Sequence, residues 1–266
     1  MANKYQERWK MIIRDWQEQF PFLKPYGSVR LMYRTDILLV GLLMERSKYG
    51  GHYKIEFEVK PLWDILMDNY HYCIEYPIID NSTKAKAGYY VAFGDYNPNR
   101  PNSYKDNHDF YFGRILKSIE QQYGNIFDGC VESGFLLNIL DLAYPNTARR
   151  YVLKSWFFYT ISNYYELQLA LALYFNDSDS WNKVYSEIEN NMIIWEKELI
   201  KRKKISRYEI SFLFDWKNTI DKILKDRDWF MTICEENSKL SKVKCLNKGR
   251  IVYTPYTPLN HTNKVF

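Results

Sequence analysis

Residues 36–60 read DILLVGLLMERSKYGGHYKIEFEVK, an apolar run that breaks at a Tyr-Gly-Gly turn and returns as an alternating segment. Glycines in such a turn supply the positive φ angles that a short hairpin requires. From residue 53 to residue 60, aromatic or apolar side chains alternate with Lys and Glu, which predicts an antiparallel strand with one wet face. The run at 37–44 is apolar on both faces and is therefore predicted to be a central strand.

The segments around this hairpin extend it into a sheet that a helix covers. β-Branched and aromatic stretches separated by turn residues predict three further strands, SVRLMYR (28–34), HYCIEYPII (71–79) and GYYVAF (88–93). Residues 4–20 carry their large apolar side chains at helical spacing, which predicts an amphipathic helix that ends at Pro21.

Residues 94–109, GDYNPNRPNSYKDNHD, are dense in turn formers and are predicted to be a boundary. Beyond them the sequence is helical in pattern to about residue 240, with predicted helices at 181–199 and 207–236. The stretch 156–175 has nearly the length of a membrane span. Asn163, Glu166 and Gln168 at its centre favour a helix within a soluble core instead.

The predicted fold class is therefore α+β, an N-terminal helix on a mainly antiparallel sheet followed by a helical C-terminal region. The predicted domains are an α+β sheet domain at 1–95, a helical region at 110–240 and a basic tail at 241–266. The net charge of +5 arises at the C-terminal end, because residues 239–266 hold six Lys or Arg and no acid. The rest is neutral, which disfavours nucleic acid as the partner.

No cofactor and no metal are predicted. His71 and Cys73 would share one face of a strand, but they are only two of the four ligands that a structural zinc site needs. The four cysteines have no disulfide or metal spacing, and the N-terminus has no apolar signal-peptide core. These features predict reduced thiols and a cytoplasmic protein with no membrane segment.

One catalytic pattern is present. Asp36 followed by Glu58 and Lys60 fits the order of restriction-endonuclease-like nucleases, in which two carboxylates hold Mg²⁺ and a lysine orients the attacking water. Cross-strand ion pairing on the wet face explains the same residues equally well. Both interpretations stay open at this level.

The stretch RLMYRTDILLVGLLMERSKYGGHYKIEFEV, within a larger similarity over about residues 5–95, resembles the start of a family of small bacterial α+β domains. Members of that family are uncharacterised, or lie beside polymorphic toxins as presumed immunity proteins. The resemblance implies a non-enzymatic cytosolic factor that neutralises a partner toxin by occlusion. A metal-dependent nuclease is the alternative, and a phage-defence or phage-encoded component that acts through protein contacts is the third possibility.

A partner-binding surface is predicted at the connection near residue 100 and on the wet strand face. Interfaces are enriched in Tyr and Arg side chains, and the prolines in this connection lower the ordering entropy that binding costs. The predicted contact residues are Tyr96, Arg100, Tyr104, Lys54, Glu56 and Glu58.

Overall fold

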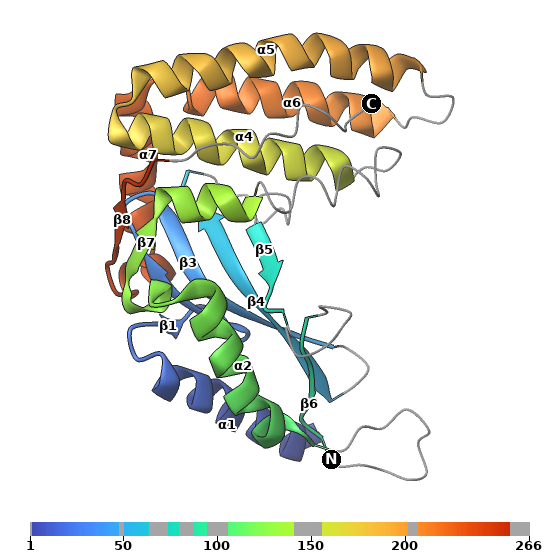
Figure 1. The fold of residues 1–266 in the computed structure, drawn as a ribbon, viewed down its shortest axis with the longest axis vertical. Helices are drawn as coiled ribbons and strands as arrows, with labels where there is room; N and C mark the ends of the chain where they lie inside the picture. The colour runs from blue at the N-terminus through green and yellow to red at the C-terminus, as the bar shows by residue number, and fades with distance from the viewer. Residues whose placement is uncertain are drawn as a thin grey trace. The chain divides into compact units, whose positions relative to one another are not determined.

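The computed structural model describes residues 2–47, 51–63, 74–79, 88–94, 106–140, 156–201 and 207–255. The chain forms two compact units, whose elements are labelled in Figure 1. Unit 1 comprises Met1–Lys60, Cys73–Val131 and Ser238–Arg250, and unit 2 comprises Pro61–Tyr72, Glu132–Asn237 and Ile251–Phe266. Each unit is therefore assembled from segments that are far apart in the sequence.

Unit 1 is built on a sheet of six strands within the described residues, in the order β1-β2-β3-β4-β5 with β6 also paired to β4. The strands are β1 (Lys24–Pro25), β2 (Arg30–Arg34), β3 (Leu38–Arg46), β4 (His52–Pro61), β5 (Ile74–Pro77) and β6 (Tyr90–Ala92). The pairs β1–β2, β2–β3, β4–β5 and β4–β6 are antiparallel, and β3 lies between β2 and β4 as predicted for a central strand. The turn at 48–50 lies outside the described residues.

Two helices, α1 (Ala2–Gln19) and α2 (His108–Tyr123), cover the apolar face of this sheet. The contacts are aromatic: the Trp9 ring lies 5.6 Å from that of Tyr53, and the Tyr123 ring lies 5.0 Å from that of Phe57. Large rings bury much apolar area, so a small number of them can hold a helix against a sheet. The predicted α+β class is confirmed.

A chain of hydrogen bonds runs through this aromatic layer. The indole Nε1 of Trp16 donates to the Tyr53 hydroxyl over 3.2 Å, and that hydroxyl lies 2.8 Å from Nδ1 of His108. Nε2 of His108 lies 3.2 Å from Oδ2 of Asp15. The Asp15 carboxylate can only accept, so Nε2–H of His108 donates to it. Burial lowers the pKa of His108, so Nδ1 of the neutral ring accepts the Tyr53 proton. The chain therefore connects α1, β4 and the first residue of α2.

The predicted boundaries at 1–95, 110–240 and 241–266 differ from the two units. α2 belongs to unit 1 because its aromatic side chains pack on α1 and the sheet, with the Phe112 ring 4.7 Å from that of Trp16. Residues 241–250, the start of the predicted tail, also belong to unit 1. There the Arg34 N–H donates to the Asn247 carbonyl over 3.0 Å, and the Gly249 N–H donates to the Arg34 carbonyl over 2.8 Å.

Unit 2 is mainly helical. Its helices include α4 (Trp156–Phe175), α5 (Ser178–Lys201), α6 (Arg207–Ile223) and α7 (Arg227–Ser238). The predicted single helix at 207–236 is wrong, because Asp226 starts a new helix: its side chain accepts the Trp229 N–H over 2.7 Å. A short helix, α8 (Ser241–Lys244), follows in unit 1, and β7 (Cys130–Glu132) pairs with β8 (Arg250–Val252) in a separate two-stranded sheet.

α4 coincides with the apolar stretch predicted to be a buried helix. Glu166 at its centre is buried, and it accepts a 2.6 Å hydrogen bond from the indole of Trp216 on α6. Among the described residues, no helix has both the length and the apolar character needed to cross a membrane. The buried Glu166 carboxylate is therefore hydrogen-bonded by a side chain from a neighbouring helix of the same unit.

A tight turn connects α4 to α5. Asn176 has a φ of 57°, and the N–H groups of Asn176 and Asp177 donate to the carbonyls of Leu173 and Ala172. These two hydrogen bonds together form a Schellman motif, which ends the helix. Asp177 then caps α5 by accepting the Ser180 N–H over 3.0 Å. The two helices are thus held as an antiparallel pair.

The first prediction concerns pH. Burial and the nearby Arg8 guanidinium lower the pKa of His108, which Asp15 partly offsets. The unfolded chain therefore takes up this proton at a higher pH than the folded chain, and stability falls as the pH drops below the ordinary pKa of about 6.5. We expect the melting temperature of the wild type to exceed that of His108→Gln at pH 7, and this difference to shrink towards pH 5. Thermal denaturation across this range measures it, and a constant difference would contradict the assignment.

Candidate functional site

Two of the three residues of the predicted nuclease pattern, Asp36 and Glu58, form ion pairs within the protein. Glu58 has no solvent exposure, and both of its carboxylate oxygens contact Nε of Arg30, at 3.0 and 2.7 Å. Asp36 lies in the turn between β2 and β3, where it pairs with Lys248 at 2.6 Å. Lys60 is half-buried near the end of β4. Within the described part of the chain, no three His, Cys, Asp or Glu side chains are placed to hold a metal ion.

The prediction that Glu58 is an accessible contact residue is wrong. Arg30 lies on β2 and Glu58 on β4, with β3 between them, so the ion pair crosses the central strand. A carboxylate buried in this way needs a charged partner to offset its lost hydration. The alternating sequence predicted that the Glu58 side chain is exposed to solvent. Alternation shows which residues share a sheet face, but it does not show which part of that face is covered.

The remaining predicted contact residues divide into two groups. Tyr96, Arg100 and Tyr104 lie outside the described residues, as do His71 and Cys73. Lys54 and Glu56 lie on β4, where Lys54 pairs with Glu45 at 2.5 Å and lies 5.9 Å from the centre of the Tyr90 ring.

These side chains belong to a patch on the polar sheet face, the sheet patch, formed by Glu45, Lys54, Glu56, Glu75 and Tyr90. Tyr90 on β6 is 60% exposed, so the patch presents an accessible ring among charges. Partial desolvation and the carboxylates of Glu58 and Glu56 raise the pKa of Glu75 to about 7. Burial likewise raises the pKa of Glu56, which Lys54 opposes. Acidic side chains thus crowd this face of the sheet.

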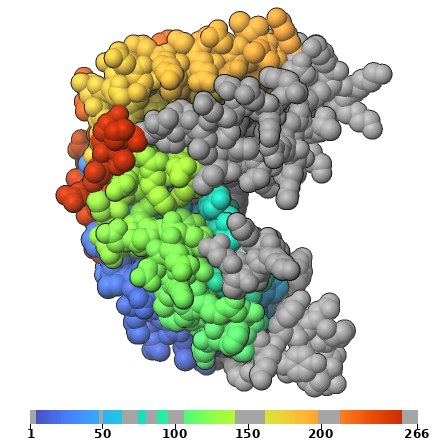
Figure 2. Space-filling model, viewed as in Figure 1, coloured from blue at the N-terminus to red at the C-terminus, as the bar shows by residue number. Residues whose placement is uncertain are grey.

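A second accessible group lies on the first turns of α2 and is called the aromatic cluster: Phe110, Tyr111 and Arg114. Phe110 is 68% exposed, and its ring stands edge-on to that of Tyr111 with 5.0 Å between the centres. The Arg114 guanidinium lies 5.9 Å from the Phe110 ring centre and 5.5 Å from the Tyr111 ring centre. Figure 2 shows α2, in green, on the visible surface. The cluster is an exposed cation–π group on a rigid helix.

The predicted contact residues near residue 100 do not include this cluster, whose first residue, Phe110, lies just beyond the predicted boundary at 94–109. The available signal was the spacing of Phe110 and Arg114, which are four residues apart and therefore neighbours on a helix surface. His108 and Phe112 point into the core from the same turns, and this sets which face of α2 is exposed.

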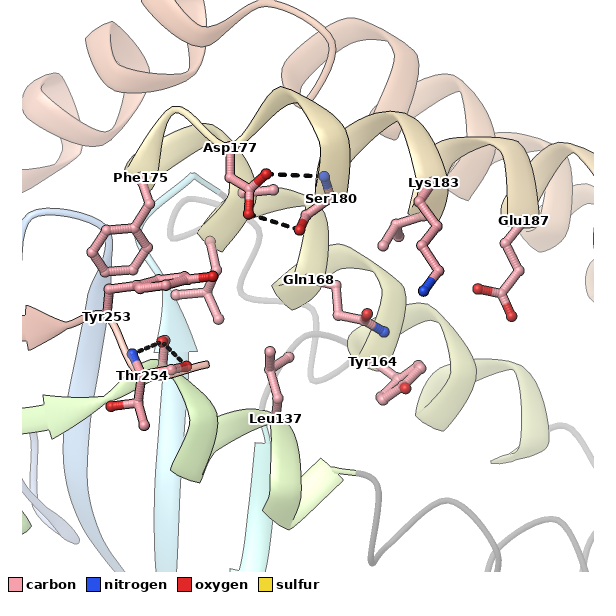
Figure 3. Close-up of a pocket in the computed structure, with 14 residues that line it drawn as sticks. Leu137, Tyr164, Gln168, Phe175, Asp177, Ser180, Lys183, Glu187, Tyr253 and Thr254 are labelled. Atoms are coloured by element: carbon pink, nitrogen blue, oxygen red, sulfur yellow. Dashed lines mark hydrogen bonds between the residues drawn. The ribbon is translucent and has the colours of Figure 1, made fainter. Parts of the chain in front are cut away.

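Unit 2 contains a cavity of about 310 Å³, drawn in Figure 3. It is enclosed by α4, by the start of α5, by the helical residues 133–140 and by residues 253–254. Its lining is part apolar and part polar: Ser133, Leu137, Tyr164, Gln168, Leu171, Ala172, Phe175, Asp177, Ser180, Lys183, Val184, Glu187, Tyr253 and Thr254. The sequence analysis did not predict it, since its walls come from segments more than 100 residues apart.

Hydrogen bonds hold one corner of this cavity. The Ser133 hydroxyl donates to the Thr254 carbonyl over 3.2 Å and accepts the Thr254 N–H over 3.0 Å. Both Asp177 oxygens are occupied by Ser180, and these hydrogen bonds lower the pKa of Asp177. Asp177 is therefore a helix cap rather than a free ligand group.

A second prediction tests the buried ion pair of unit 1. Arg30→Met should destabilise the protein by about 3–5 kcal/mol, because it leaves the Glu58 carboxylate buried and uncompensated. The double variant Arg30→Met with Glu58→Gln should recover much of this loss, because the uncompensated charge is gone. Urea denaturation of the three proteins measures both steps. A double variant no more stable than Arg30→Met would show that the cost arises from lost packing instead.

Comparisons with protein families, with curated proteins and with solved structures found no match to this chain. Any assignment of function therefore rests on the arrangement of its own side chains.

Proposed function

We propose that this protein is a non-enzymatic binding factor, most specifically an immunity protein that neutralises a partner toxin by covering it. The observation that carries the proposal is the aromatic cluster on α2. An exposed Phe beside a Tyr and an Arg is the composition that binding hot spots favour. A ring that is 68% exposed in the free protein gains the most from burial against a partner.

The support of α2 makes this cluster a pre-organised surface. His108 at the start of the helix is buried and hydrogen-bonded to Tyr53 and Asp15. On the outer side, Arg8 on α1 contacts Asp109 at 2.9 Å and Asp106 at 2.9 Å. A surface that is already ordered loses little conformational entropy on binding, which leaves more of the contact energy for affinity.

The sheet patch supplies a second, charged region of unit 1. Lys54, Glu45 and Tyr90 are arranged as an ion pair beside an exposed ring. Charged groups at the rim of an interface mainly set specificity and association rate, whereas buried aromatic groups set affinity. The proposed roles are therefore different: the aromatic cluster anchors the partner, and the sheet patch selects it.

The nuclease alternative receives no such support. Its three residues would have to converge on a metal ion and a phosphate. Instead, the Glu58 carboxylate faces Arg30 and the Asp36 carboxylate faces Lys248.

The third prediction tests the binding proposal. Phe110→Ala combined with Arg114→Ala should leave the melting temperature nearly unchanged, because both side chains lie at the surface of α2. It should weaken partner affinity by roughly 2 kcal/mol or more, the range of hot-spot residues. Glu120→Ala, an exposed position on another side of the same helix, is the matched control and should bind like the wild type.

The partner is obtained by affinity purification from the native host with wild type, variant and control as parallel baits. Expression of the partner alone should arrest growth, and co-expression of the wild type or the control should restore growth. Rescue by the double variant at wild-type efficiency would remove the aromatic cluster from the interface. A captured protein that is harmless when expressed alone would contradict the immunity role.

A further inference from the structure

We propose that the cavity of unit 2 is a binding site for a free amino acid with an apolar or aromatic side chain. This site is separate from the surfaces of unit 1 and does not rest on the proposed immunity function. The cavity volume of about 310 Å³ is at the lower limit of small-molecule pockets. A ligand of this size is small enough to be enclosed, whereas a dinucleotide is too large.

One end of the cavity is apolar and aromatic. The Phe175 and Tyr253 rings stand edge-to-face with their centres 5.1 Å apart, and Figure 3 shows both at one end of the opening. Leu171, Ala172 and Val184 lie on the adjoining walls. Tyr253 is 54% exposed in the free protein, so part of its ring is available for contact with a ligand. This end suits an apolar or aromatic side chain.

The other end carries two opposite charges. Lys183 and Glu187 are four residues apart on α5, hence neighbours on one helix face, and Figure 3 shows both side chains extending towards Gln168 and Tyr164 of α4. In the described part of the chain, neither Lys183 nor Glu187 forms an ion pair. A cation and an anion are thus presented together, both exposed to solvent where they line the cavity, and each is available to a ligand.

This pair is complementary to a zwitterion. A free amino acid carries its carboxylate and its ammonium group on one carbon, so Lys183 can bind the first while Glu187 binds the second. A residue at a peptide terminus carries only one of these charges, and a phosphate ester would place its negative charge beside Glu187. The Gln168 amide can donate and accept further hydrogen bonds, with the ligand side chain lying against the Phe175–Tyr253 end.

The site follows from helix periodicity. Tyr164, Gln168, Leu171 and Phe175 lie on one face of α4, at offsets of zero, four, seven and eleven residues. On α5, Ser180, Lys183, Val184 and Glu187 lie at offsets of zero, three, four and seven. Each helix thus presents a single stripe to the cavity, and the Asn176–Asp177 turn fixes the two stripes against each other.

The test uses the full chain and calorimetric titration at pH 7 with L-phenylalanine as the probe. We expect saturable binding at one site per chain. Phenylacetate lacks the ammonium group and phenethylamine lacks the carboxylate, so each should bind about tenfold more weakly or worse. Glycine, which has no side chain for the aromatic end, should also bind more weakly. Equal affinity for phenylacetate or for glycine would overturn the assignment.

Variants locate the binding. Lys183→Gln and Glu187→Gln should each weaken L-phenylalanine binding about tenfold, and Leu137→Trp should abolish it by filling the cavity. Lys197→Gln and Glu196→Gln change the same types of charge on an exposed part of α5 and should have no effect. Absence of binding at millimolar L-phenylalanine, or wild-type affinity in Lys183→Gln or Leu137→Trp, would overturn the proposal.

Discussion

The hydrogen-bond chain from Trp16 through Tyr53 and His108 to Asp15 is the constraint on which unit 1 depends. Every member of the chain has a partner, and a buried donor or acceptor left without one costs about 1–3 kcal/mol. The chain therefore accepts only one relative placement of α1, β4 and the start of α2. Aromatic and aliphatic side chains together supply the apolar burial, but apolar packing alone tolerates sliding. The directional bonds provide the specificity that packing lacks.

This constraint connects the core of unit 1 to its surface. His108 points inward, and Phe110, only two residues later, points outward on the same helical turn. Because the inner residue is fixed, so is the orientation of the exposed ring and of Arg114, four residues further along. The Arg30–Glu58 pair has a similar structural effect on the other face of the sheet, where it satisfies a buried carboxylate across the central strand. Polar groups that look functional in the sequence are thus part of the framework that supports a surface.

The sequence predicted those features that depend on local pattern. The apolar stretch at 37–44 is a central strand and residues 156–175 form one helix, because each prediction rests on the local pattern of apolar residues. The break between α6 and α7 was missed because residues 224–227, Leu-Lys-Asp-Arg, contain neither the Gly nor the Pro that commonly marks the end of a helix. Residues 241–250 were read as a tail because their charge was visible, whereas their backbone bonds to Arg34 were not. Long-range pairing of this kind leaves no local signal.

The candidate sites were less predictable for the same reason. Asp36 and Glu58 match a nuclease pattern by spacing, and only the positions of Lys248 and Arg30 show what those carboxylates contact. Lys183 and Glu187 are exposed helix positions, and only the approach of residues 133–140 and 253–254 makes them part of a cavity lining. Convergence of segments that are distant in sequence is a property of the fold, and a single sequence does not encode it in any short window.

The protonation state of His108 tests this account most directly. Nitrogen-15 NMR of the ring at pH 7 distinguishes the two neutral tautomers and the imidazolium. The direction of the chain, from the Trp16 donor to the Asp15 acceptor, predicts a neutral ring with the proton on Nε2 and an unprotonated Nδ1 that accepts from Tyr53. A proton on Nδ1, in either the other tautomer or the imidazolium, would contradict the chain as the constraint that orients α2.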